Sequence, residues 1–185
     1  MRFFYWTGAI VLLVLTLSVL FRGPIFRTFF HFSDLHERSA AGTRQKGPVP
    51  ERTVSVMPAK ELDACIDAPL DETANALVFT IEPAANDAAG ALRSGRANCV
   101  GYAVLFQRTC EEKLLQAGLS GEWRVLHLRG LLYCGDFNLH RLVYSPFWKD
   151  HDICAIENRA TGQRILVDPS LFDVARIRRV SGPMN

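Results

Sequence analysis

The sequence has little net charge and no concentrated basic surface, which argues against nucleic-acid binding. The formal net charge is +2, and no basic stripe with interleaved aromatic residues occurs, as binding to a phosphate backbone would require. The one basic cluster, Arg176, Arg178 and Arg179, is interpreted as a solvated face, with contact to anionic lipid headgroups as the alternative. We therefore expect no nucleic acid among the partners.

The chain also lacks the paired cysteines of a structural metal site. Its five cysteines are never spaced as a Cys-x₂₋₄-Cys pair, and its histidines are scattered. We expect no metal and no other cofactor, so a metal-binding domain is only a third alternative. An odd number of cysteines leaves at least one free thiol even if the others pair. These residues are Cys65, Cys99, Cys110, Cys134 and Cys154.

Charge is absent from Phe3 to Phe21, a run flanked by Arg2 and Arg22. At about 1.5 Å per residue, a helix of this length spans a bilayer core of roughly 30 Å. The end of the run, Ser18–Pro24, contains no small-x-small cleavage site of the kind that signal peptides have. Residues 1–22 are therefore predicted to form an uncleaved N-terminal membrane anchor, with a buried core helix as the alternative.

Two signals disagree about the side of the membrane on which the rest of the chain lies. Arg22 and Arg27 follow the apolar run, whereas only Arg2 and the α-amino group precede it, which favours a cytoplasmic domain. The very short basic tail before the run is typical of a secretion signal, which favours export. We expect a single-pass membrane protein, with the bilayer as one partner and an extracytoplasmic (periplasmic) domain.

The chain after the anchor divides into a linker and one folded domain. Residues 23–57 are predicted to be a membrane-proximal segment and linker, because Ile25–Phe32 is aromatic and the stretch from 39 onward is rich in Ser, Gly, Pro and charge. Residues 58–180 are predicted to be the domain. A helix is expected over Asp71–Phe79, and a longer one from Cys99, capped by Asn98 and stopped by Gly118.

Strand patterns fill the second half of this domain. A turn at Asn158–Gln163 joins two of them into a predicted hairpin. A leading helix followed by antiparallel strands predicts an α+β fold, with the Cys99 helix packed on the sheet. The expected strands are Trp123–Arg129, His151–Glu157, Arg164–Asp168 and, as a weaker candidate, Leu139–Tyr144.

Three residues form a candidate catalytic group: Cys99 as nucleophile, His151 as base and Asp168 as the residue that orients the base. A thiol at a helix N-terminus is activated by the helix dipole. The hairpin returns Asp168 beside His151, at the separation that a carboxylate–imidazole hydrogen bond needs. Packing of the Cys99 helix on the face that His151 shares with Ile153 and Ala155 would complete the group.

The other thiols and imidazoles are interpreted as structural. Cys110, Cys134 and Cys154 fit core positions, and Cys154 points away from His151. His127 and His140 are interpreted as surface or hydrogen-bonded core residues, with His140 as a second candidate base. His31 and His36 are expected to be solvated.

These motifs resemble the transglutaminase-like superfamily over roughly residues 93 to 173. The matching segments are Asn98-Cys99-Val100-Gly101-Tyr102-Ala103 with Phe106, Leu114–Leu119, His151, and Asp168-Pro169-Ser170. The family usually has His-Ala-Trp, whereas this chain has His151-Asp152-Ile153. Ala97 also stands where the family usually has glycine.

The resemblance implies a papain-like α+β core with a Cys99, His151, Asp168 triad. It further implies a membrane-tethered cysteine enzyme that acts on peptide or glutamine-type amide bonds through a thioester. A protease or amidase is favoured over a cross-linking transferase, and the partner is a peptide or protein substrate. The alternative is a catalytically silent transglutaminase-like module that binds a peptide or protein partner at the membrane.

Overall fold

The computed structural model describes residues 2–38, 59–142 and 149–183, and an antiparallel sheet forms its centre. The strands β1 (Phe30–Glu37), β4 (Trp123–Cys134), β6 (His151–Asn158) and β7 (Arg164–Val167) lie in that order, and β5 (Phe137–Asn138) pairs with β4. A separate pair of parallel strands is formed by β2 (Val78–Phe79) and β3 (Arg96–Ala97). The predicted α+β class is confirmed.

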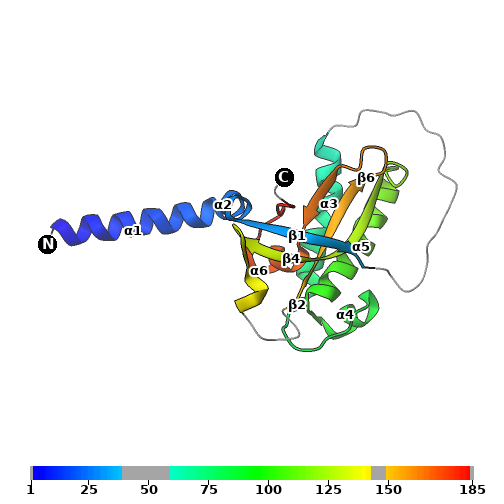
Figure 1. Ribbon diagram of the computed structural model, residues 1–185, viewed down its shortest axis with the longest axis horizontal. Coiled ribbons are helices and arrows are strands. Elements are labelled where there is room, and N and C mark those ends of the chain that lie inside the picture. Colours follow the sequence, from blue (N-terminus) through cyan, green and yellow to red (C-terminus); the bar gives the residue numbers. More distant parts are fainter. Residues whose placement is uncertain (1, 39–58, 143–148, 184–185) are drawn as a thin grey trace.

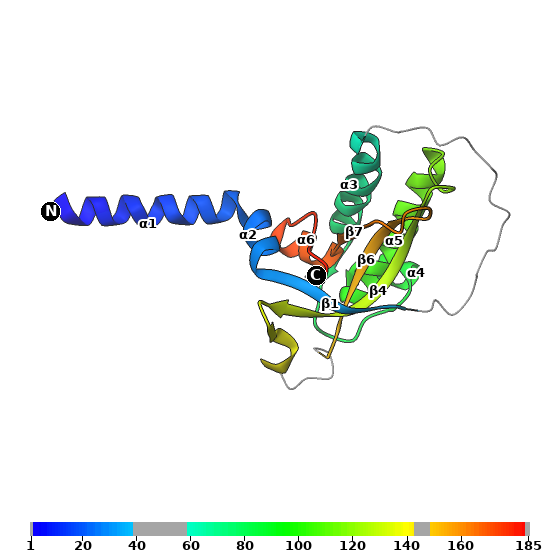
Figure 2. The same cartoon turned by 45° about the horizontal axis from the view of Figure 1, so that its top comes forward.

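Two long helices, α3 (Ala59–Ala76) and α5 (Cys99–Gln116), cover one face of the sheet (Figures 1 and 2). Side chains alternate along a strand, so Cys154 and Ile156 of β6 point to this face, where they pack with Phe106 of α5. The opposite face carries Ile153, Ala155 and the buried Phe32 of β1, and Phe26, before β1, and Val180, near the C-terminus, pack against it.

The α5 helix has the limits that the sequence predicts. The Asn98 side chain accepts hydrogen bonds from the backbone N–H of Val100 and of Gly101, at 3.1 and 3.3 Å. Gly118, just past the last turn, has φ +75°, a conformation that favours glycine. The strands expected over 123–129, 151–157 and 164–168 are also present.

Two expected elements differ from the structure. Leu139–Leu142 is a 3₁₀ helix (η1) rather than the start of a strand, and the rest of the stretch expected over Leu139–Tyr144 lies outside the described residues. The helix expected over Asp71–Phe79 begins earlier, at Ala59, and continues through Pro69 to Ala76. Val78 and Phe79 belong instead to β2, because their backbone pairs with β3.

The sheet begins earlier in the chain than the sequence predicts. β1 lies within the stretch 23–57 predicted to be linker, yet it pairs along β4 from Phe30 opposite Cys134 to Glu37 opposite Leu128. His31 is therefore only 9% exposed and stacks on Tyr133, with 5.4 Å between ring centroids. The expectation that His31 is solvated is wrong, whereas His36 is exposed as expected.

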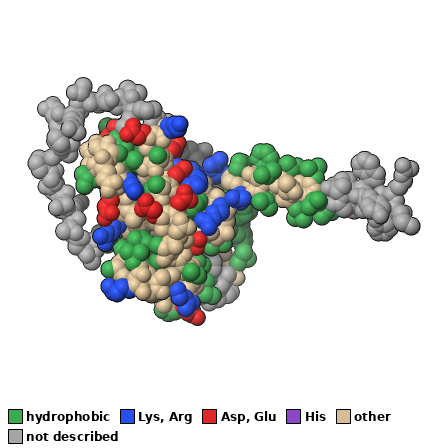
Figure 3. All heavy atoms as spheres, turned by 180° about the vertical axis from the view of Figure 1, so that it is seen from behind, with side chains coloured by type: hydrophobic (Ala, Val, Ile, Leu, Met, Phe, Trp, Pro, Cys, Tyr) green, Lys and Arg blue, Asp and Glu red, His purple; other side chains and the backbone are tan. Residues whose placement is uncertain are grey.

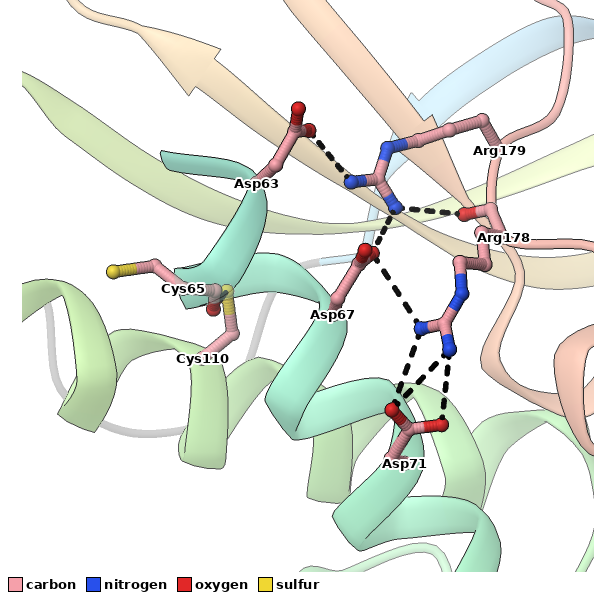
Figure 4. A network of polar contacts seen from close by, with 7 residues as sticks. All are labelled: Asp63, Cys65, Asp67, Asp71, Cys110, Arg178 and Arg179. Atoms are coloured by element: carbon pink, nitrogen blue, oxygen red, sulfur yellow. Dashed lines mark hydrogen bonds and ion pairs between the residues drawn. The ribbon is translucent and has the colours of Figure 1, made fainter. Parts of the chain in front are cut away.

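The C-terminal segment 176–183 is held across α3 by ion pairs (Figure 4). Arg179 reaches Asp63 at 2.9 Å and Asp67 at 2.8 Å, and Arg178 reaches Asp71 at 3.3 Å. Arg178 is exposed, as the interpretation of a solvated face expects, whereas Arg179 is only 19% exposed and departs from it. The Ser181 carbonyl also accepts the Phe32 N–H at 2.9 Å, so this segment is tied to β1 as well.

The N-terminal helix α1 (Arg2–Leu20) projects away from the rest of the molecule (Figure 1). Val11–Leu20 meets α2 (Arg22–Phe29) at 77°, and only this bent pair is long and apolar enough to suggest a membrane crossing. No single helix among the described residues meets that requirement, so the expected one transmembrane helix is not found. The chain turns at Phe21, directly before Arg22.

We predict that Gly101→Ala destabilises the domain by about 1–3 kcal/mol, because an added Cβ overpacks the first turn of α5. That Cβ would lie 2.7 Å from the Ala97 Cβ and 3.1 Å from the Ala85 carbonyl oxygen, and neither atom can rotate away. The measurement is urea unfolding of the full chain in detergent. Gly121→Ala, where nothing lies within 4 Å of the new Cβ, is the control. Equal stability of the two variants would contradict the prediction.

Candidate functional site

Cys99 is the first residue of α5, directly after its capping residue. Asp87 caps the short α4 (Ala88–Ser94), Gly95 turns the chain in the left-handed conformation, and β3 then leads into Asn98. The backbone N–H of Cys99 lies in the first turn of α5, where N–H groups have no intrahelical acceptor. Asn98 caps this turn through its side chain. The Cys99 side chain is only 6% exposed.

His151 and Asp168 form a direct hydrogen bond, with His151 Nε2 and Asp168 Oδ2 2.7 Å apart. His151 begins β6, and Asp168 follows β7 and caps α6 (Pro169–Ala175). The second carboxylate oxygen of Asp168 accepts the Ser170 hydroxyl at 2.7 Å and the Leu171 N–H at 2.9 Å. Both carboxylate oxygens of Asp168 thus accept short hydrogen bonds. These bonds lie inside the protein, because Asp168 is only 2% exposed.

These contacts shift both groups toward their charged forms. Burial by itself lowers the pKa of His151, but the charge and hydrogen bond of Asp168 raise it well above the ordinary histidine value. A hydrogen bond and the charge of Cys99 raise the pKa of His151 further. Burial by itself raises the pKa of Asp168, yet the His151 charge and the hydrogen bonds leave it below its ordinary value. The structure therefore joins His151 directly to Asp168 and places the Cys99 thiol near enough to act on the pKa of His151.

A residue from β1 packs on the imidazole of this group. The Phe32 ring stacks on the His151 ring, with centroids 5.7 Å apart and planes inclined by 21°. Gly130 pairs with His151 across the β4–β6 ladder, and a Cβ on it would lie 2.6 Å from the Leu35 side chain. The same Cβ would lie 3.0 Å from the Ser33 carbonyl oxygen, so a larger residue would require the Leu35 side chain to move and β1 to shift slightly.

A second carboxylate–imidazole pair also lies beside the thiol. Asp152 Oδ1 lies 2.7 Å from His127 Nε2 and also accepts a hydrogen bond from Arg38, while Asp152 Oδ2 lies 3.9 Å from the Cys99 sulfur. Burial by itself raises the pKa of Asp152, but the hydrogen bonds and charges of His127 and Arg38 leave it below its ordinary value. The sequence did not single out these three residues for the site, although Asp152 stood out as a departure from the family motif.

The helix packs on the opposite face of the sheet from the one predicted. α5 covers the face of Cys154 and Ile156, which is also the face of Asp152, whereas Ile153 points to the other side. The prediction that α5 packs on the face of Ile153 and Ala155 is therefore wrong, because the apolar face of α5 matches the Cys154 face. Cys99 still reaches His151, since each residue stands at the first position of its element.

The five cysteines are all free. Burial raises the pKa of Cys65, raises that of Cys110 to about 12 and raises that of Cys154 well above its ordinary value. Cys110 and Cys154 donate to backbone carbonyls of the core, as their predicted structural roles require. Cys134 is partly exposed at the end of β4. His140, the second candidate base, lies in η1.

Among residues 2–38, 59–142 and 149–183, no group of three or more His, Cys, Asp and Glu side chains is placed to hold a metal ion.

Comparison with known proteins finds no matching family model, no matching curated protein and no matching solved structure.

We predict that Asp168→Asn lowers the pKa of His151. The substitution removes the charge that raises this pKa, while the burial that lowers it stays. The measurement is the pH titration of the His151 ring resonances by NMR, with His127, which pairs with Asp152 rather than Asp168, as the reference within the same sample. An unchanged His151 midpoint in the variant would contradict the assignment of Asp168 as its charge partner.

Proposed function

We propose that this chain is a membrane-tethered, cysteine-dependent amide hydrolase of the transglutaminase-like type. The observation that supports it most is the hydrogen bond of His151 to a buried carboxylate, with a thiol at the start of a helix near enough to help raise the pKa of that imidazole. An imidazole with a raised pKa favours the thiolate of a thiol that it contacts, and the thiolate is the reactive form. The proposed substrate is a peptide or protein amide, including the glutamine type.

The proposed reaction proceeds through a thioester. Cys99 Sγ attacks the amide carbonyl carbon while its proton passes to His151, and the resulting oxyanion accepts the backbone N–H of Cys99. His151 then donates the proton to the leaving amine as the carbon–nitrogen bond breaks. Water attacks the thioester, giving one proton to His151, and the acid and the free thiol are released. Asp168 keeps the imidazole oriented, with Nε2 bonded to the carboxylate, throughout.

Hydrolysis is favoured over transfer to an amine because water needs no second binding site on the protein. An amine that attacked the same thioester would give a cross-linked product by the same proton transfers. The residues that we assign to catalysis, Cys99, His151 and Asp168, are the same for both outcomes.

One observation favours a second candidate function, a catalytically silent module that binds a peptide or protein partner. The Cys99 thiol donates to the buried Asp152 carboxylate at 3.9 Å, so an acid is among its direct partners. In the family, alanine usually stands where this chain has Asp152. The two candidates therefore differ in the reactivity of the Cys99 thiol.

The proposed tether is the N-terminal helical region. All the large apolar side chains described in α1, from Val11 to Leu20, are between 42% and 69% exposed, so the domain does not cover them. Figure 3 shows these side chains along the described part of the helix, with Lys and Arg side chains where it meets the domain. Burial of this surface in lipid would remove it from water. We propose that the domain lies outside the cytoplasm.

We predict that iodoacetamide at near-neutral pH alkylates Cys99 faster than the other four cysteines, and that His151→Ala slows this reaction at least about tenfold. The measurement is the rate of label incorporation into each cysteine peptide by mass spectrometry. Cys134, which is more exposed than Cys99, serves as the internal control for access. Slow labelling of native Cys99 at the rate of Cys134 or below would exclude the enzyme and leave the binding module.

A reporter that is active only outside the cytoplasm, fused after Asn185, is expected to be active. The reason is the proposed export of the domain, and the measurement is reporter activity in intact cells. Activity of a matched cytoplasmic reporter at the same position, with none from the first, would overturn the proposed side of the membrane.

A further inference from the structure

Near Cys99, two acidic side chains are buried, whereas two of the basic side chains paired with them reach the solvent. The two acids, Asp152 and Asp168, are each 2% exposed, whereas two of their partners are more open, with His151 19% and Arg38 41% exposed; the third partner, His127, is 7% exposed. Of these groups, His151 and Arg38 are therefore the ones that solvent reaches most readily.

Backbone contacts position Arg38 at this opening. A bulge between Ser33 and His36 shifts the register of β1, after which Glu37 pairs with Leu128 and the Arg38 N–H donates to the His127 carbonyl at 2.9 Å. The Arg38 side chain then donates through Nη1 to Asp152 Oδ1. A guanidinium has five N–H donors, and the 41% exposed side chain offers solvent the donors that Asp152 does not take.

The neighbouring acids do not neutralise the positive charge that Arg38 presents to the solvent. The buried Asp152 carboxylate contacts Arg38, His127 and the thiol at once, so its single negative charge only partly neutralises Arg38. Asp150, a partly exposed acid that acts on Arg38, is itself 3.5 Å from Arg129. The Asp152 carboxylate that accepts from Arg38 also lies 3.9 Å from the Cys99 sulfur, so the guanidinium and the sulfur flank the same buried acid.

We propose that Arg38 binds an anionic group of the substrate, and that the acyl substrate has a carboxylate close to the amide bond that Cys99 attacks. This inference rests on the proposed function, because it assigns a substrate class to the same site. A planar guanidinium matches a carboxylate through two parallel hydrogen bonds. Arg38 is a specificity residue here, and Cys99 and His151 remain the groups that break the bond.

The test compares two alkylating reagents of nearly equal size, iodoacetate and iodoacetamide, on the full chain in detergent at pH 7 and low salt. Each reagent forms a bond from its methylene carbon to Cys99 Sγ and expels iodide, and the two differ in having a carboxylate or a neutral amide. The quantity measured is the ratio of the iodoacetate rate constant to the iodoacetamide rate constant at Cys99, relative to that ratio in the unfolded chain.

We expect this relative ratio to exceed one in the native protein and to fall about tenfold in Arg38→Gln, the effect of one charge-assisted hydrogen bond. Loss of Arg38 also leaves Asp152 less compensated, and this carboxylate, 3.9 Å from the sulfur, repels iodoacetate more than iodoacetamide. The comparison is therefore repeated in an Asp152→Asn background, where Arg38→Gln is still expected to lower the ratio if Arg38 binds the reagent's carboxylate. Arg38→Lys retains the charge and is expected to keep most of the preference. Arg124→Gln is the matched control, because Arg124 is also 41% exposed and pairs with Glu157 instead.

Salt provides a measurement that needs no variant. Raising the salt from about 0.05 to 0.5 M should slow iodoacetate at native Cys99 and leave iodoacetamide nearly unchanged, because screening acts on the charged reagent. An unchanged ratio in Arg38→Gln, with fast labelling by iodoacetamide, overturns the anion site and leaves the proposed enzyme standing. Slow labelling of native Cys99 by both reagents overturns the enzyme itself.

Discussion

The buried carboxylate of Asp168 joins three parts of the domain. One oxygen accepts hydrogen bonds from Leu171 and Ser170 at the start of α6, and the other binds His151. The residue itself directly follows β7. A carboxylate that is 2% exposed is stable as an ion only with such partners. The same bonds that stabilise the fold at this corner therefore orient the imidazole and favour its protonated form, so the local fold and the candidate chemistry depend on one charge.

Two carboxylate–imidazole pairs lie near Cys99. One pair contains His151, whose pKa the neighbouring thiol helps to raise. The other contains Asp152, which accepts the Cys99 thiol at 3.9 Å and whose pKa is lowered by His127 and Arg38. The groups around the sulfur come from four separate strands or strand ends.

The segment that follows the N-terminal helix contributes directly to this site. β1 provides Phe32 against the His151 ring and leads to Arg38 beside Asp152, and its backbone is also bonded to the C-terminal segment through Ser181. Because α2 leads directly into β1, the N-terminal helices are joined to the strand that packs on His151 and leads to Arg38.

The sequence by itself determined the elements whose signals are local. Asn98 and Gly118 delimit α5 because a cap and a left-handed stop act within a few residues, and the hairpin of β6 and β7 brings Asp168 to His151 because its turn sets the register. Tertiary structure alone decided which face of the sheet α5 covers, that β1 joins the sheet, and that Arg38 and His127 surround Asp152. These outcomes depend on contacts between segments far apart in the chain, up to about a hundred residues. The alternation of residues along one strand shows that the strand has two faces, but it does not show which other segment covers each face.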